Sequence, residues 1–162
     1  MALRRLTSIK VSGENSMSSW WKVKNPVKTM LNFILIYSAR FAPSLRLKRF
    51  LYRLAGAKIG KGVSFGLGAV LDIFFPELIE IGDNSIIGYN STILAHEFLI
   101  KELKTGQVKI GKGVMVGANC TVLAGVEIGD GACISACSLV NSDVPAGSFI
   151  GGVPAKIIKR NH

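Results

Sequence analysis

A six-residue period over residues 59–141 constrains this 162-residue chain more than any other feature. Each unit begins with an aliphatic or aromatic residue, and seven of the twelve units carry glycine in second position, where an ordinary helix or strand would not tolerate it. The fifth position is usually small or β-branched, as in Val63, Ser85 and Cys120. The first two residues of the twelve units are Ile59-Gly60, Phe65-Gly66, Leu71-Asp72, Ile81-Gly82, Ile87-Gly88, Ile93-Leu94, Ile110-Gly111, Val116-Gly117, Val122-Leu123, Ile128-Gly129, Ile134-Ser135 and Val140-Asn141.

This period predicts an all-β fold, a left-handed parallel β-helix over residues 58–157. Each hexapeptide forms a short strand and a corner, and three hexapeptides complete one triangular coil. First-position side chains stack inside the coils, fifth-position residues fill the corners, and glycine permits the corner backbone. Because one repeat cannot bury its own apolar face, only stacked coils give a continuous core. We expect Cys120, at a fifth position, to be a small core residue.

The N-terminal part carries the net charge. Residues 1–62 contain 13 Lys and Arg and one acid, a net charge of +12, whereas residues 63–162 carry −2. Residues 1–18 lack an apolar period and are predicted to be a disordered leader, with Met17 as an alternative native start. Residues 19–57 are predicted to form a short, basic, amphipathic α-helical segment, in which Ser44 caps a helix with one apolar face at Leu47, Phe50, Leu51 and Leu54.

Two roles for this helical segment remain open. It either lies on an anionic membrane surface or packs on the β-helix or a neighbouring subunit. The apolar run from Met30 to Ala39 is too short to cross a bilayer, and no clean cleavage site follows it to support a signal peptide. We therefore expect a cytoplasmic protein, either free or peripheral at the inner face of the membrane. No nucleic-acid motif is present, and three cysteines without a paired motif indicate reduced thiols.

The period breaks twice, near residues 74–80 and at 98–109, and the second break follows His96 directly. Residues 98–109 are predicted to project as a loop. A neutral histidine beside such a loop can accept the proton of an attacking hydroxyl group. On the residues alone, a surface histidine at a coil corner is the competing interpretation.

The chain resembles the hexapeptide-repeat acyltransferases, the group with galactoside, maltose and xenobiotic acetyltransferases. The resemblance covers roughly residues 51–160 and rests on the repeat, on the Thr92-Ile-Leu-Ala-His96-Glu-Phe segment, and on the ending from Asp143-Val-Pro145 through Gly152-Val-Pro154-Ala155-Lys156. It implies a homotrimer with active sites between neighbouring prisms, acetyl-CoA as co-substrate, and His96 as general base.

Other roles follow from the same resemblance. Gly117, Ala118 and Ala136 match positions that hold the pantetheine arm, and an amide near Gly117 or Ala118 would stabilise the oxyanion. Lys156 and Lys159 match residues that contact the nucleotide phosphates. Asn141 and Ser142 occupy cofactor-binding positions where many relatives have Thr-Lys, so one phosphate-binding cation is missing, and Met115 stands where many have Trp.

Two carboxylates complete the candidate site. Asp72 replaces the usual glycine of its repeat and is expected either to contact the acceptor or to orient a base, with a solvated corner as the alternative. Glu97 is also expected to contact the substrate, to raise the basicity of His96, or to face water.

We therefore expect an acyl-CoA-dependent O-acyltransferase, transferring acetyl to a sugar hydroxyl of a surface glycan or glycolipid, as in polysaccharide biosynthesis. A xenobiotic or amine acetyltransferase and a non-enzymatic β-helix scaffold are the alternatives. The γ-class carbonic anhydrases share the fold but need three histidines on a metal; with two histidines in the chain, we expect no metal.

Overall fold

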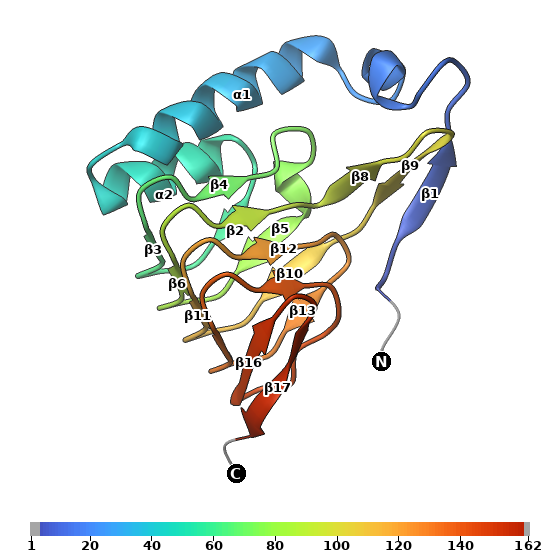
Figure 1. Cartoon of the computed structure of the whole chain (residues 1–162). Helices are drawn as coiled ribbons and strands as arrows, with labels where there is room; N and C mark the ends of the chain where they lie inside the picture. The colour runs from blue at the N-terminus through green and yellow to red at the C-terminus, as the bar shows by residue number, and fades with distance from the viewer. Residues whose placement is uncertain (1–3, 161–162) are drawn as a thin grey trace.

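The computed structural model describes residues 4–160 and contains the predicted parallel β-helix (Figure 1). Three parallel sheets form the three sides of a stacked triangular coil. The first sheet holds β2 (Lys58–Ile59), β5 (Ile79–Ile81), β10 (Val108–Ile110) and β13 (Glu127–Ile128). The second holds β3 (Ser64–Phe65), β6 (Ile86–Ile87), β11 (Met115–Val116), β14 (Cys133–Ile134) and β16 (Ser148–Gly152), with β17 (Ala155–Arg160) antiparallel to β16. The third holds β4 (Val70–Leu71), β7 (Thr92–Ile93), β12 (Thr121–Val122) and β15 (Leu139–Val140).

The repeat positions lie where the sequence places them. First-position side chains are buried in one continuous core, and equivalent residues such as Ile81, Ile110 and Ile128 pair directly from coil to coil. Fifth-position residues, Cys120 among them, are also buried. The buried serines satisfy their hydroxyl groups locally: Ser85 Oγ donates to the Gly111 carbonyl at 2.8 Å and accepts from the Val114 amide at 3.1 Å.

The three corners of the prism are not equivalent. Glycines occupy the corner between the first and second sheets and most of the corner between the second and third, and there the coils stack backbone on backbone. A Cβ on Gly117 would lie 2.5 Å from the Ala136 nitrogen. The corner between the third and first sheets, here called the open edge, has no glycine in second position: Asp72, Leu94, Leu123 and Asn141 stand there. Both breaks in the period leave the prism at this edge.

The longer insertion, predicted to project as a loop at residues 98–109, projects as a β-hairpin. Strand β8 (His96–Phe98) begins at the histidine itself and pairs antiparallel with β9 (Glu102–Thr105), and the coil resumes at Val108. The shorter insertion contains a 3-10 turn, η2 (Pro76–Leu78).

The prediction of a disordered leader is wrong for the described residues 4–18; residues 1–3 lie outside them. Strand β1 (Thr7–Lys10) pairs antiparallel with β9 and completes a three-stranded sheet that projects from the prism (Figure 1). Arg5 anchors it through its guanidinium, which donates two 2.9 Å hydrogen bonds to Asp143. These partners lie far away in the sequence, so the composition of residues 1–18 did not reveal them.

Two helices cover the N-terminal end of the prism, α1 (Pro26–Phe41) and α2 (Leu45–Leu54), preceded by the 3-10 helix η1 (Met17–Lys22) (Figure 1). The Asn25 side chain caps α1, and Ser44 caps α2 as predicted. The buried Tyr52 donates a 2.6 Å hydrogen bond to the Ala69 carbonyl, which fixes α2 to the first coil. One face of these helices therefore packs on the prism, which was one of the two roles expected for the helical segment. Among the described residues, no helix is both long and apolar enough to traverse a bilayer.

Candidate active site

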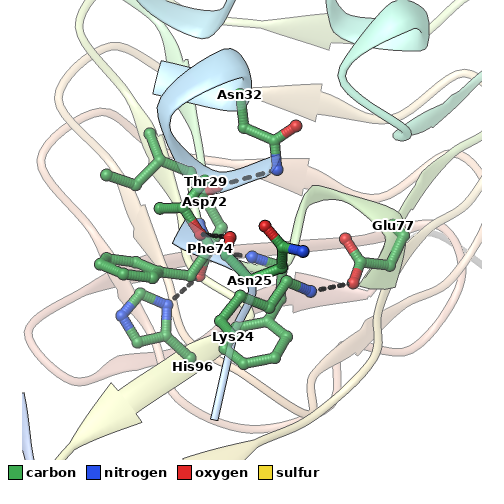
Figure 2. Close-up of polar contacts among 10 residues, drawn as sticks. Lys24, Asn25, Thr29, Asn32, Asp72, Phe74, Glu77 and His96 are labelled. Carbon is green, nitrogen blue, oxygen red and sulfur yellow. Dashed lines mark hydrogen bonds and ion pairs between the residues drawn. The ribbon is translucent and has the colours of Figure 1, made fainter. Parts of the chain in front are cut away.

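His96 and Asp72 form a hydrogen-bonded pair on the open edge (Figure 2). Asp72 ends the first coil after β4, and His96 follows β7 of the next coil, directly above it in the stack. The Asp72 side chain is 0% exposed, and the His96 side chain is 13% exposed. Asp72 Oδ1 accepts hydrogen bonds from the amides of Phe74 and Phe75 at 2.8 and 3.0 Å. Asp72 Oδ2 accepts one from the Ala95 amide at 2.8 Å and contacts His96 Nδ1.

These contacts fix the ionisation of Asp72 and the tautomer of His96. Burial by itself raises the pKa of Asp72, but the hydrogen bond and charge of His96, with the Phe75 and Ala95 amides, lower the pKa overall. An ionised Asp72 accepts a hydrogen bond from His96 Nδ1–H, so Nδ1 carries the proton of the neutral imidazole and the lone pair of Nε2 remains available. Within the described residues, no hydrogen bond occupies Nε2. The pair can therefore accept a proton at one defined atom.

An aromatic wall surrounds the imidazole. Ring centroids of Phe74 and Phe98 lie 5.0 and 4.8 Å from that of His96, both edge-on, and Phe75 lies at 5.8 Å. Trp20, from η1, packs edge-on against Phe74 at 5.6 Å, so the N-terminal segment contributes to the site. Lys24 Nζ lies 4.2 Å from the Phe75 ring centroid and pairs with Glu77 (Figure 2).

The two carboxylates of the candidate site, Asp72 and Glu97, both bind protein groups. Asp72 is buried and its oxygens are occupied by protein donors, so the alternative of a solvated corner is wrong. Of its two expected roles, the geometry matches the orientation of the base. Glu97 points away from His96, because successive side chains of a strand face opposite sides. Its carboxylate pairs with Arg4, whose guanidinium also lies 3.4 Å from the Ala124 carbonyl. Glu97 therefore anchors the residues before β1 to the hairpin.

The predicted pantetheine positions lie at a different corner. Gly117, Ala118 and Ala136 follow strands of the second sheet and stand at the corner between the second and third sheets, away from the open edge. The Gly117 amide already donates to the Ile134 carbonyl at 2.9 Å, so it cannot serve an oxyanion. No such bond engages the Ala118 amide within the described residues. A single chain does not unite these residues with His96.

The predicted phosphate contacts lie near the C-terminal end of the prism. Ser142 and Lys156 line one pocket of about 520 Å³, together with Val140, Pro145 and Pro154. Asn141 is adjacent, and its buried Oδ1 has no hydrogen-bond partner among the described residues. Lys159 is exposed on β17 and does not line this pocket.

The sequence did not indicate Trp20, Phe98 or Arg4 as parts of this region. One signal was available for the two aromatic residues. Aromatic residues make up only 8% of the chain, yet several flank the two breaks in the period. Arg4 carried no comparable signal, because only the antiparallel pairing of β1 brings it to Glu97.

Comparison with known proteins identifies the family. Residues 107–142 match the family described as bacterial transferase hexapeptide (six repeats), and residues 56–95 match the hexapeptide repeat of succinyl-transferase. The Bacillus subtilis (strain 168) protein named "Putative acetyltransferase YvoF" is 50% identical over 157 residues, which span 96% of this chain and 91% of the relative. The chain therefore belongs to the hexapeptide-repeat acetyltransferases and is an acetyltransferase of that family.

Two solved structures place the fold. The hexapeptide-repeat acetyltransferase of Vibrio cholerae O1 biovar eltor, complexed with acetyl coenzyme A, superimposes with a TM-score of 0.66 at 20% identity, covering 83% of this chain and 87% of the other. The polySia-specific acetyltransferase NeuO superimposes with a TM-score of 0.55 at 27% identity, covering 64% and 51%. The predicted left-handed β-helix is thereby confirmed.

Proposed function

We propose that the protein transfers acetyl from acetyl-CoA to a sugar hydroxyl, with His96 as general base and Asp72 as the residue that positions it. The observation that carries the proposal is the buried Asp72 carboxylate, held by three backbone amides and bound to His96 Nδ1. A surface histidine at a coil corner would need no such partner.

The acceptor hydroxyl would donate its proton to His96 Nε2 as its oxygen attacks the thioester carbonyl carbon. The imidazolium that forms is stabilised by the ionised Asp72. Collapse of the tetrahedral intermediate breaks the carbon–sulfur bond, and the imidazolium returns its proton to the departing thiolate. The free Ala118 amide, and not that of Gly117, is the donor we assign to the oxyanion.

The active site would be completed by a second subunit. His96 stands on the open edge, whereas Ala118 and Ala136 stand at another corner of the same prism. A homotrimer with parallel prism axes would set the open edge of one subunit against that corner of its neighbour. A cleft of this kind would hold the pantetheine arm between subunits and lead toward Ser142 and Lys156, with Asn141 and Lys159 nearby.

The aromatic wall favours a sugar acceptor. Apolar ring faces at Phe74, Phe98 and Trp20 suit the C–H face of a pyranose, and the polySia-specific neighbour is a precedent within this fold. An apolar amine or xenobiotic acceptor would suit the same rings and is the second candidate. A panel of sugars and amines assayed with acetyl-CoA would separate the two.

The test of the mechanism is kinetic. His96→Ala should lower kcat by about 10²–10⁴-fold, the usual contribution of a positioned general base. Asp72→Asn should also lower kcat, with little change in KM for acetyl-CoA, and should change the pH profile because the imidazole loses its fixed tautomer. Full activity in His96→Ala would exclude the assigned role.

Asp83→Asn is the matched control. Asp83 also sits at a coil corner and accepts a backbone hydrogen bond, from the Lys61 amide at 2.7 Å, but on a different corner of the prism. It should leave kcat and the pH profile unchanged. A thermal shift with CoA in each variant would show that the folded protein still binds the co-substrate.

A further inference from the structure

Helix α1 exposes most of its large apolar side chains. A helix on a soluble protein normally turns its apolar stripe inward. Here the buried positions are Thr29, Asn32, Ile36 and Ala39, so two of the four are polar, and the Asn32 amide donates a 3.1 Å hydrogen bond to the Ile73 carbonyl (Figure 2). The opposite face is exposed and almost wholly apolar, with Ile34 at its centre 53% exposed. The exposed apolar and aromatic residues of α1 are Val27, Met30, Leu31, Phe33, Ile34, Tyr37 and Phe41.

Helix α2 continues this pattern. Of the four residues on its predicted apolar face, Leu51 packs partly against the core, whereas Leu47, Phe50 and Leu54 are exposed, with Phe50 at 59%. The contacts that fix α2 come from other faces, through Tyr52 and through Lys48, which donates to the Ala39 and Arg40 carbonyls at 3.0 and 2.9 Å. The exposed apolar residues of α1 and α2 together are called the cap face below.

Basic residues accompany the cap face without any acid. No Asp or Glu occurs between residues 15 and 71, a stretch that holds ten Lys and Arg. Lys22, Lys28, Arg46 and Arg53 are exposed beside or within the two helices. Each cation near an anionic lipid surface contributes about 1 kcal/mol, and the apolar side chains add their burial at the acyl boundary.

We propose that the cap face binds an anionic phospholipid surface, with α1 and α2 lying in the interfacial layer. Charge decides between this occupant and a second copy of the chain. A symmetric contact would bring two identical positive surfaces together with no acid on either helix, whereas lipid phosphates complement them. This inference goes beyond the proposed acetyl transfer and does not depend on it.

Docking through this face would also set the active site close to the bilayer. Helix α1 follows η1, whose Trp20 packs on Phe74, and Asn32 binds the backbone at Ile73, the residue after Asp72. Helix α1, which carries part of the cap face, and the preceding η1 thus contact the residues that follow Asp72. An acceptor carried by a lipid would meet His96 without leaving the surface.

The test is sedimentation of the full chain with vesicles. Wild-type protein should bind vesicles of phosphatidylcholine and phosphatidylglycerol, release at high salt, and bind phosphatidylcholine alone weakly. Ile34→Glu should reduce binding about tenfold or more, because a charge replaces an inserted apolar side chain. The double variant Lys28→Gln, Arg46→Gln should reduce binding to anionic vesicles about thirtyfold and change binding to neutral vesicles little.

Ile158→Glu is the matched control, since Ile158 is 60% exposed on β17 at the opposite end of the prism. It should bind anionic vesicles nearly as well as the wild type. Mass measurement by light scattering checks the rival occupant. The proposal would be overturned if wild-type protein failed to bind anionic vesicles or if Ile34→Glu bound them fully. It would also be overturned if Ile34→Glu formed a smaller assembly than the wild type. Acetyl transfer to a soluble acceptor, measured in parallel, reports the proposed function separately.

Discussion

Asp72 occupies a corner position of the repeat and is also part of the candidate active site. Most other units of the repeat have glycine at this position. The buried Asp72 side chain accepts hydrogen bonds from three backbone amides and contacts His96. The sequence identified His96 and Asp72 as candidates, because each interrupts the pattern. It could not identify their contact, since that depends on this coil with its insertion being 22 residues long, as the pairing of Leu71 with Ile93 shows, which sets His96 two residues beyond the position stacked on Asp72.

Asp72→Asn should weaken the fold in a pH-dependent way. Because the folded state lowers the pKa of Asp72, its ionised form stabilises the protein above the ordinary carboxyl pKa of about 4, and this contribution is lost as pH falls through the lower folded value. The melting temperature of the variant should therefore lie well below that of the wild type at pH 7 and approach it under strongly acidic conditions. A gap that stays constant with pH would contradict the direction of the shift.

The projecting sheet marks the limit of what the sequence predicts at the level of elements. Coils were predictable because a six-residue rule repeats locally and each strand pairs with the next coil. The pairing of β1 with β9 joins segments nearly a hundred residues apart and follows no period, so residues 1–18 read as a leader. Helix α2 was predicted from its Ser44 cap and its apolar period, but the exposure of the apolar face of α1 was not, because periodicity does not say which face is buried.

Gly106 is the point where this sheet meets the prism. A Cβ there would lie 2.6 Å from the Arg5 carbonyl oxygen and 2.7 Å from the Gly125 nitrogen. Gly106→Ala should therefore displace the segment before β1 and destabilise the protein by about 1–3 kcal/mol, as overpacking does. Limited proteolysis should cut the N-terminal segment faster in the variant.

Gly113→Ala provides the comparison for that variant. Gly113 has φ of +61° with open space around its Cβ position, so its substitution carries only the backbone cost of about 1 kcal/mol. It should leave the proteolysis of the N-terminal segment unchanged. Equal rates of proteolysis in the two variants would show that the docking of β1 does not depend on Gly106.

At the scale of the whole molecule, the proposed site needs two corners from two subunits. Co-expression of His96→Ala with Ala118→Trp, which fills the proposed pantetheine path on the other corner, should restore activity that neither variant has alone. With random assembly, about one quarter of the clefts would combine two intact corners. Activity no greater than the sum of the separate variants would place the whole site within one chain, provided that light scattering shows the Ala118→Trp protein assembled.

The open edge differs from the other two corners of the prism in what it can accommodate. Two corners are locked by backbone stacking and cannot accept an extra residue without separating the coils. The third carries both departures from the repeat, and with them the proposed general base His96, its partner Asp72 and the aromatic rings around them. Changes in the length of residues 73–78 or 99–101 can therefore reshape acceptor recognition while every coil keeps its register. For this enzyme, we expect new acceptor preferences to arise most readily through insertions and deletions on the open edge, because such changes leave the coils in register.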